Sequence, residues 1–298
     1  MIHSSHPHAP DWLLAFQKNI QSKDGEDGIL EKIFEIIGEE SRWCVEMGAL
    51  TGGYGSNVWY LLKERGWQGV LIEADPTYFE ELQREYAGDA KATCLNEFVS
   101  FEGKSTLDAI LSGTSIPKGF DLLSLDIDGN DYHVWESLTQ YRPRVLVVEF
   151  NPSIPNNVSF VQPRDMSISQ GSSLRALVAL GKQKGYELVG ANKDNAFFVL
   201  AELFDKFAMS NDQLDAVHTD QSLVTYLFQL YDGTIKIAGN QSLIWHQSPI
   251  SEKKLQMLSA RKRFFPNRTS SRSWVRKLKF LARKNPLYPF VQRIRKLV

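Results

Sequence analysis

The sequence has few of the features that mark secreted, membrane-spanning or disulfide-rich proteins. Its 298 residues contain two cysteines, Cys44 and Cys94, too few to argue a disulfide framework. No apolar run reaches the roughly 18 residues that a membrane-spanning helix needs. Residues 1–10 also lack the apolar core of a secretion signal. We therefore expect a cytoplasmic protein, and a hydrophobic fraction of 43% is ordinary for a globular one.

Acidic residues are absent from the end of the chain. Residues 261–298 hold 13 of the 34 Lys and Arg residues and no acid, so the rest carries 21 basic and 35 acidic residues, a balance of −14. Within 273–284, Trp274, Leu278 and Leu281 share one helical face. Such a basic amphipathic tail, over 273–297, suits an anionic membrane surface at the inner face of the membrane. A helix packed on the acidic body fits equally well, and no nucleic-acid-binding module accompanies the charge.

Strand-like and helix-like segments alternate from residue 43 to residue 200. The pattern predicts strands over 43–48, 69–74, 91–98, 122–128, 145–151, 186–191 and 196–200, and helices over 57–65, 77–86, 106–111, 132–138 and 174–184. Strands separated by single helices predict a parallel sheet. A turn at 192–195 predicts a terminal hairpin with the last strand antiparallel. The expected fold is α/β and Rossmann-like, with a seven-stranded, mostly parallel sheet.

Further segments flank this predicted core. Residues 11–38 are expected to be helical around a polar loop at 24–28, and 223–230 is expected to form a helix before a strand at 231–237. We divide the chain into an N-terminal helical segment (1–40), the α/β core (41–205), a C-terminal addition (206–260) and the basic tail (261–298). The C-terminal extension is expected to be helical. The irregular segment 156–173 and residues 203–250 are predicted to cover a binding site, because loops this long in compact domains are often lids.

Two buried strands end in acids. Asp126 and Asp128 close the run that begins at Leu122, with Asp131 soon after, and Glu149 and Asn151 close the run that begins at Val145. In an open α/β sheet, ligands bind beyond the carboxyl ends of the strands, so these residues are the first candidates for chemistry. The segment 128–131 also fits a turn that caps the following helix.

A glycine-rich turn follows the first predicted strand, with Gly48, Gly52, Gly53 and Gly55. Glu73 ends the second strand, where a carboxylate can accept two hydrogen bonds from a ribose diol. Nucleotide, NAD and S-adenosylmethionine (SAM) sites share this arrangement, and a plain tight turn with an exposed acid gives the same pattern. The spacing is not the Gly-x-Gly-x-x-Gly of dinucleotide-binding folds.

Several motifs together resemble the FkbM-type SAM-dependent methyltransferases, over about residues 22–202. They are the glycine turn, Ile72–Pro76, Ser105–Asp108, Leu125–Gly129 and Pro143–Glu149. A subgroup with motifs like Gly25–Gly28, Asp126–Tyr132 and Asn195–Val199 is most similar. The chain departs from the family at Asp75-Pro76, where many members have Glu-Pro, and at Glu46, where many have Asp.

The resemblance implies a class I methyltransferase fold and methyl transfer from SAM. The acceptor would be a hydroxyl on a sugar, a glycolipid or a glycosylated metabolite. Residues expected to bind the methionine part are Glu46, Gly48 and Gly52, Glu73 would bind the ribose, and Asn96 and Glu97 would lie near the adenine. The expected cofactor site also includes Ala49, Asn57 and Asp75.

The strand-end acids then have two possible roles. Asp126, Glu149 and Asn151 offer hard oxygen ligands of the kind that suits Mg²⁺, and a metal would lower the pKa of the acceptor hydroxyl. Alternatively Asp126 or Asp128 acts as a general base, with Asp131 beside them. Two competing functions are an NAD-dependent oxidoreductase on the same kind of sheet and a non-catalytic partner protein that kept the fold.

Overall fold

The computed structural model describes residues 8–209 and 213–265, and its contacts divide the chain into two compact units, Met1–Val224 and Thr225–Val298. The limits at 40, 205 and 260 stay predictions, and the basic amphipathic segment 273–297 lies outside the described residues. No helix in the described part is both long and apolar enough to cross a membrane.

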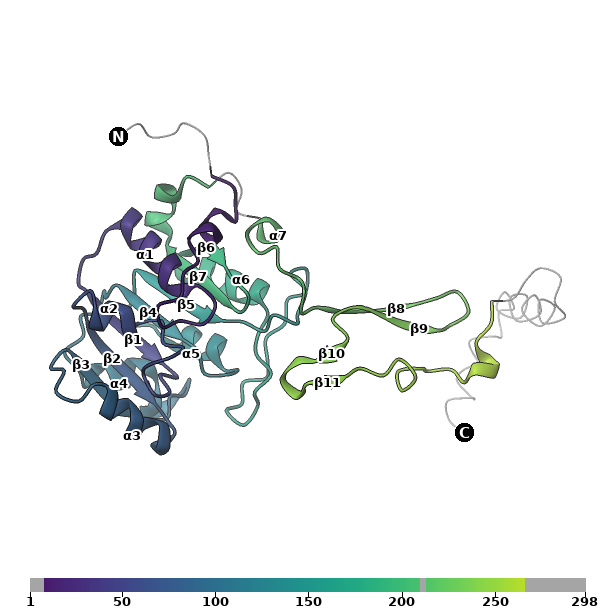
Figure 1. Cartoon of the computed structure of the whole chain (residues 1–298), viewed down its shortest axis with the longest axis horizontal. Helices are drawn as coiled ribbons and strands as arrows, with labels where there is room; N and C mark the ends of the chain where they lie inside the picture. Colours follow the sequence, from purple (N-terminus) through teal and green to yellow (C-terminus); the bar gives the residue numbers. More distant parts are fainter. Residues whose placement is uncertain (1–7, 210–212, 266–298) are drawn as a thin grey trace, which may run out of the picture. The chain divides into compact units, whose positions relative to one another are not determined.

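The first unit is built on one seven-stranded sheet of order β3-β2-β1-β4-β5-β7-β6 (Figure 1). Its strands are β1 Trp43–Met47, β2 Gln68–Glu73, β3 Ala92–Asn96, β4 Leu122–Leu125, β5 Val145–Glu149, β6 Tyr186–Ala191 and β7 Asn195–Leu200. The pairs among β1 to β5 are parallel, whereas β7 is antiparallel to both β5 and β6. The predicted Rossmann-like sheet and its antiparallel last strand are confirmed.

Helices cover both faces of the sheet. Along β5, Leu146 and Val148 enter one buried cluster with α4 Leu107–Ser112, α5 Asp131–Ser137 and α6 Leu174–Lys184. Val145 and Val147 enter the opposite cluster, with α1 Glu26–Ile37, α2 Trp59–Lys63 and α3 Pro76–Glu85. Successive side chains of a strand point to opposite faces, so these continuous apolar runs bury both sides of the sheet.

The N-terminal segment differs in detail from the prediction. A short 3-10 helix, η1 Trp12–Phe16, precedes α1, and α1 begins at Glu26, inside the stretch expected to be a polar loop. Asp27 explains the early start: its Oδ2 atom accepts the N–H groups of Ile20, Gln21 and Ser22 at 2.7–2.9 Å. The acid in the first turn of α1 therefore folds the preceding loop back onto the helix.

The remaining elements are short. The first unit adds η2 Gly103–Ser105, η3 Ala201–Phe207 and α7 Leu214–Val217. The second unit has β8 Thr225–Gln229, β9 Ile235–Gly239, β10 Ser242–Leu243, η4 Ile244–His246, β11 Ser248–Pro249 and η5 Ala260–Lys262. The helix expected over 223–230 is wrong, because this stretch pairs with β9 in an antiparallel hairpin. Its Thr, Tyr and Phe residues favour a strand, and the expected strand after residue 231 is present.

Candidate functional site

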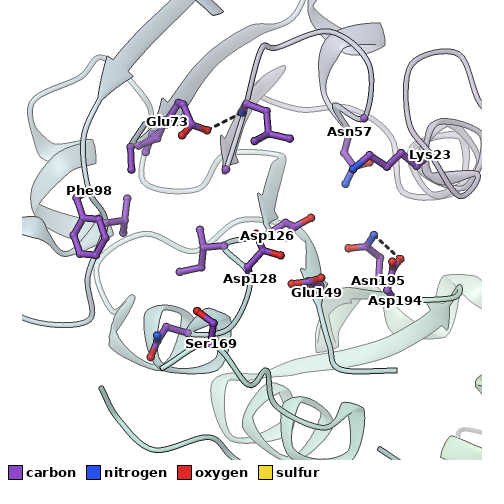
Figure 2. A pocket seen from close by; sticks show the side chains of 18 of the residues that line it. Lys23, Asn57, Glu73, Phe98, Asp126, Asp128, Glu149, Ser169, Asp194 and Asn195 are labelled. Atoms are coloured by element: carbon purple, nitrogen blue, oxygen red, sulfur yellow. Dashed lines mark hydrogen bonds between the residues drawn. The ribbon is translucent and has the colours of Figure 1, made fainter. Parts of the chain in front are cut away.

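A cavity of about 420 Å³ opens where the carboxyl ends of β1, β2, β4 and β5 meet. Its lining includes one lysine, Lys23, and eight acids, namely Asp24, Glu26, Glu73, Glu97, Asp126, Asp128, Glu149 and Asp194. Figure 2 shows Asp126, Asp128 and Glu149 grouped in the middle, with Glu73 on one side and Asp194 and Asn195 on the other. The strand-end acids are therefore brought together, as the sequence predicts.

Gly48 allows the chain to turn at the end of β1. Its φ is +70°, and a Cβ atom built there would lie 1.9 Å from the carbonyl oxygen of Asp126, the residue that follows β4. Only a residue without a side chain permits this close approach of the two strand ends. Gly48 and Asn57 both line the pocket, whereas Ala49 and Gly52 of the predicted cofactor set do not.

Glu73 ends β2 at the pocket wall and is 6% exposed. Its two oxygens accept the N–H groups of Leu50, at 2.8 Å, and Asp75, at 2.7 Å. A carboxylate has about four acceptor positions, so it can also accept bonds from a ligand diol. Asp75 has a different role, because its side chain caps α3 by accepting the N–H groups of Thr77 and Tyr78.

The two residues expected near the adenine differ in position. Glu97 borders the pocket, but Asn96 does not. The Asn96 amide instead donates to the carbonyl oxygens of Glu73 and Ala74, at 2.8 and 3.2 Å, and so fixes the end of β2. Phe98, which the sequence analysis overlooked, lines the pocket and is 57% exposed. An exposed aromatic ring at this wall offers a stacking surface.

Glu46 lies behind the glycine turn and does not line the pocket. It is buried, and its carboxylate accepts the Ser56 hydroxyl and the Asn57 N–H, both at 2.7 Å. Burial raises the pKa of Glu46 to about 7, although the two hydrogen bonds act in the opposite direction. Glu46 therefore supports the turn and the start of α2.

Asp126, Asp128 and Glu149 each offer an oxygen within 4.8 Å of the others. Burial, and then the charge of Asp128, raises the pKa of Asp126, while a hydrogen bond with Glu149 lowers it. Burial, and then the charges of Asp126 and Asp131, raise the pKa of Glu149 to about 11. At neutral pH the Glu149 carboxyl therefore keeps its proton, which it donates in the hydrogen bond to Asp126.

Two predicted site residues have structural roles instead. Asp131 is buried and accepts the N–H groups of Ile127 and Gly129, at 2.9 and 3.0 Å, so it closes the turn after β4. The expected turn is present, but the N-cap residue of α5, Asn130, makes no side-chain capping bond. Asn151 does not line the pocket, and its carboxamide oxygen accepts both the Ser153 N–H and hydroxyl. Of the three predicted cation ligands, Asp126 and Glu149 line the pocket, with Asp128 beside them, and a bound cation stays a prediction.

One wall of the pocket was not predicted. Lys23 and Asp24 reach it from the N-terminal loop, and Glu26 from the start of α1. Asp194, just before β7, and Asn195, its first residue, reach it from the other side. Asp194 has a pKa raised to about 6, first by burial and then by the charge of Asp24. The Gly25–Gly28 and Asn195–Val199 motifs lie at or beside this wall, but in the sequence they indicated only a family resemblance and no role for a side chain.

Part of the long segment 156–173 reaches the pocket, through Met166 and Ser169. Gln162 organises this segment: its amide donates to Ile168 O at 2.9 Å, and its carboxamide oxygen accepts the N–H groups of Gln170 and Gly171. The segment therefore forms a defined wall. Whether it opens as a lid stays a prediction, as does a cover formed by residues 203–250.

Comparison with known proteins gives likenesses of fold. The chain matches no family model and no curated protein. Among solved structures, the CMeT domain of the citrinin polyketide synthase is 13% identical with a TM-score of 0.41, over 59% of this chain and 51% of that one. The N-terminal domain of EvdMO1 with SAH bound is 11% identical with a TM-score of 0.40, over 60% and 82%. A SAM-dependent methyltransferase from Aquifex aeolicus is 11% identical with a TM-score of 0.36, over 64% and 97%.

The chain thus spans about half the length of the citrinin polyketide synthase domain. Identities and TM-scores this low concern the fold alone and add no argument about activity.

Proposed function

We propose that the protein is a SAM-dependent methyltransferase that methylates a hydroxyl group of a sugar, a glycolipid or a glycosylated metabolite. The observation that carries this proposal is one cavity bordered by a glycine turn at β1, an acid at the end of β2 and clustered acids at the ends of β4 and β5. The first two features suit a nucleoside cofactor, and the acids suit the activation of an acceptor beside it.

The residues present fit SAM. A cavity of about 420 Å³ is in the range of small-molecule sites. Glu73 would accept the ribose hydroxyls, and Phe98 and Ile127 would border the adenine. Gly48 would lie beside the methionine part, where the absence of a side chain leaves room. The acids would favour the positively charged sulfonium and ammonium groups of SAM.

The same features disfavour an NAD-dependent oxidoreductase. Dinucleotide-binding sheets have the strand order 3-2-1-4-5-6 and a Gly-x-Gly-x-x-Gly turn fitted to the pyrophosphate. In this chain the antiparallel β7 lies between β5 and β6. The turn after β1 also has a different glycine spacing.

When bound, SAM supplies a methyl group on a positively charged sulfur. The acceptor oxygen would bond to the methyl carbon as the carbon–sulfur bond breaks, with S-adenosylhomocysteine (SAH) as the leaving group. The hydroxyl proton has to go to a base. Asp126, which accepts a hydrogen bond from Glu149, would take up the proton, with Asp128 alongside. General-base catalysis contributes roughly 10²- to 10⁴-fold.

A divalent cation is the second way to activate the hydroxyl. Asp126, Asp128 and Glu149 would hold Mg²⁺, and the metal would supply a positive charge that lowers the pKa of the hydroxyl. Cation binding would displace the proton from Glu149, so metal affinity would rise with pH. The FkbM-type assignment and the sugar acceptor stay parts of this proposal.

A transfer assay tests the proposed function. Purified full-length protein is incubated with methyl-labelled SAM and fractionated glycan and glycolipid extracts, with and without EDTA. The proposal expects the labelled methyl group in a methyl ether formed on a hydroxyl of the product. Loss of transfer with EDTA and its return with Mg²⁺ would favour the metal, and EDTA-insensitive transfer would favour the base. Absence of labelled product in every fraction, with intact SAM recovered, would contradict the proposal.

A further inference from the structure

The pocket presents an electrostatic problem for its proposed cofactor. SAM carries two cationic groups and one anionic group, the α-carboxylate of its methionine part. Eight acids line the cavity together with one lysine. Burying a carboxylate among like charges is costly unless it gains a cation or several N–H donors. The SAM carboxylate therefore needs a specific partner in this pocket.

The glycine turn does not offer the free backbone N–H groups that would bind this carboxylate. The N–H groups of residues 48, 49, 52, 55 and 56 donate to backbone carbonyls of the protein, and those of residues 50, 57, 58 and 59 donate to the side chains of Glu73, Glu46 and Ser56. Free N–H groups at such a turn often hold anions. Here the N–H groups of these nine residues are already bonded, and residues 51, 53 and 54, which complete the turn, do not line the pocket. Glu46 adds a carboxylate before the start of α2.

Lys23 reaches the pocket next to this turn. A Cβ atom built on Gly55 would lie 2.8 Å from the Lys23 Cε atom, so glycine at 55 leaves room for the lysine side chain. Figure 2 shows Lys23 entering the pocket on the side where Asn57 lies. Within the described part of the chain, Lys23 forms no ion pair. Its ammonium is thus available to an anion.

The loop that carries Lys23 is held in place at several points. The Asn19 amide donates to the Lys23 carbonyl oxygen at 2.7 Å, and the Asn19 carboxamide oxygen accepts the Gly25 N–H at 2.6 Å. The Gly55 N–H donates to Gln21 O at 2.6 Å, which ties the loop to the glycine turn. With Asp27 holding residues 20–22, the backbone of Lys23 is fixed relative to the methionine end of the pocket.

We propose that Lys23 binds the α-carboxylate of SAM and so positions the methionine part of the cofactor. This inference rests on the proposed function and adds a residue to it. A charge-assisted hydrogen bond of this kind is worth about 1.5–3 kcal/mol. That range corresponds to a change in the dissociation constant of roughly ten- to hundredfold.

The test compares SAM with decarboxylated SAM, which lacks only the carboxylate. Dissociation constants of both ligands are measured by calorimetry on the full chain, as wild type, Lys23→Met and Lys23→Arg. We expect Lys23→Met to weaken SAM binding by roughly tenfold or more and to change the binding of decarboxylated SAM by less than about twofold. Lys23→Arg should restore most of the loss.

A matched control distinguishes a direct contact with the SAM carboxylate from a general effect of positive charge near the pocket. Lys193 is 51% exposed, lies 4.0 Å from Asp24 and does not line the pocket, so Lys193→Met removes a nearby charge without the proposed contact. It should leave both ligands unchanged. Lys23 also lowers the pKa of Asp126 by its charge. That effect would act on both ligands alike, so an equal loss for both would overturn the proposal.

The remaining outcomes are also decisive. Unchanged SAM affinity in Lys23→Met, in a wild-type protein that binds SAM, would refute the role of Lys23 and leave the proposed function standing. A folded wild-type protein that binds neither ligand would contradict the proposed function, and this inference with it. Circular dichroism of each variant shows whether the fold is kept.

Discussion

The Glu73 carboxylate accepts the Leu50 N–H at 2.8 Å, which joins the end of β2 to the glycine turn after β1. Its second oxygen accepts the Asp75 N–H at 2.7 Å. The acid that we assign to the ribose is therefore also a fixed part of the pocket wall.

Replacing Glu73 tests the cofactor assignment. Glu73→Ala should raise the dissociation constant of SAH by roughly tenfold or more, because hydrogen bonds to a charged group contribute about 1.5–3 kcal/mol. The Leu50 and Asp75 N–H groups would lose a buried partner, so the variant should also be less stable. Calorimetric titration with SAH, beside a urea unfolding curve, measures both effects.

Asp75 provides the matched control for Glu73. It lies two residues further along the chain, is exposed and caps α3. Asp75→Ala should lower the melting temperature through the lost cap and leave SAH affinity within about twofold. Equal losses of SAH affinity in the two variants would show that a disturbed loop, and not a ribose contact, explains the effect.

Variants of Asp126 and Asp131 distinguish a catalytic role from a structural one. Asp126→Asn should lower kcat by roughly 10²-fold or more while SAH binding stays within a few-fold, because the proton acceptor is lost and the wall is kept. Asp131→Asn should chiefly lower stability, since Asp131 accepts two buried N–H groups in the turn. Transfer assays and unfolding curves on both variants would distinguish them, and unchanged kcat in Asp126→Asn would remove Asp126 from the chemistry.

The ion pair between Asp121 and Arg144 ties α1 to the sheet. Their oxygen and nitrogen lie 2.7 Å apart, the two residues are 0% and 5% exposed, and Arg144 also donates to the carbonyls of Ile37 and Gly38. Arg144→Met should cost about 3–5 kcal/mol, because it leaves a buried carboxylate without its cation. Urea unfolding measures the loss, and the double variant with Asp121→Asn should lose less than the sum. A loss below about 1 kcal/mol in Arg144→Met would contradict the importance of this pair.

The raised pKa of Glu46 leads to a prediction of how the free energy of unfolding changes with pH. Burial raises its pKa from 4.5 in the unfolded chain to about 7, so between these values the folded state binds the proton more strongly. The free energy of unfolding should therefore be greatest below pH 4.5 and fall as pH rises to 7, by about 3 kcal/mol from this group. Asp131 and Asp194 act in the same direction.

The contribution of Glu46 is isolated by comparing the wild type with Glu46→Gln in urea at pH 5 and pH 8. The variant should show a smaller fall in unfolding free energy between these values. An equal fall in both proteins would mean that Glu46 titrates normally in the folded state.

Most of the sheet could be predicted because its signals are local. Apolar runs such as 145–148 mark strands that are buried on both faces, and glycine or proline marks their ends. The segment 223–230 misled the prediction because apolar residues at 224, 227 and 228 fit a helix as well as a strand. Pairing with β9, which no local pattern reveals, decides between the two.

The candidate site was predictable in position but not in every side chain. Strand ends located Asp126, Glu149 and Glu73, since their place follows from the sheet. The direction of Asn151 depends on Ser153, and that of Asp131 depends on the turn at 127–129. Lys23 and Asp194 come from segments far apart in the sequence, and only the tertiary fold brings them to one cavity.

The most direct test of the central claim is a calorimetric titration of the purified full-length protein with SAH and, separately, with NAD. The account predicts saturable binding of one SAH per chain, weakened at least about tenfold by Glu73→Ala, and no measurable binding of NAD. Saturable NAD binding without SAH binding would contradict the account.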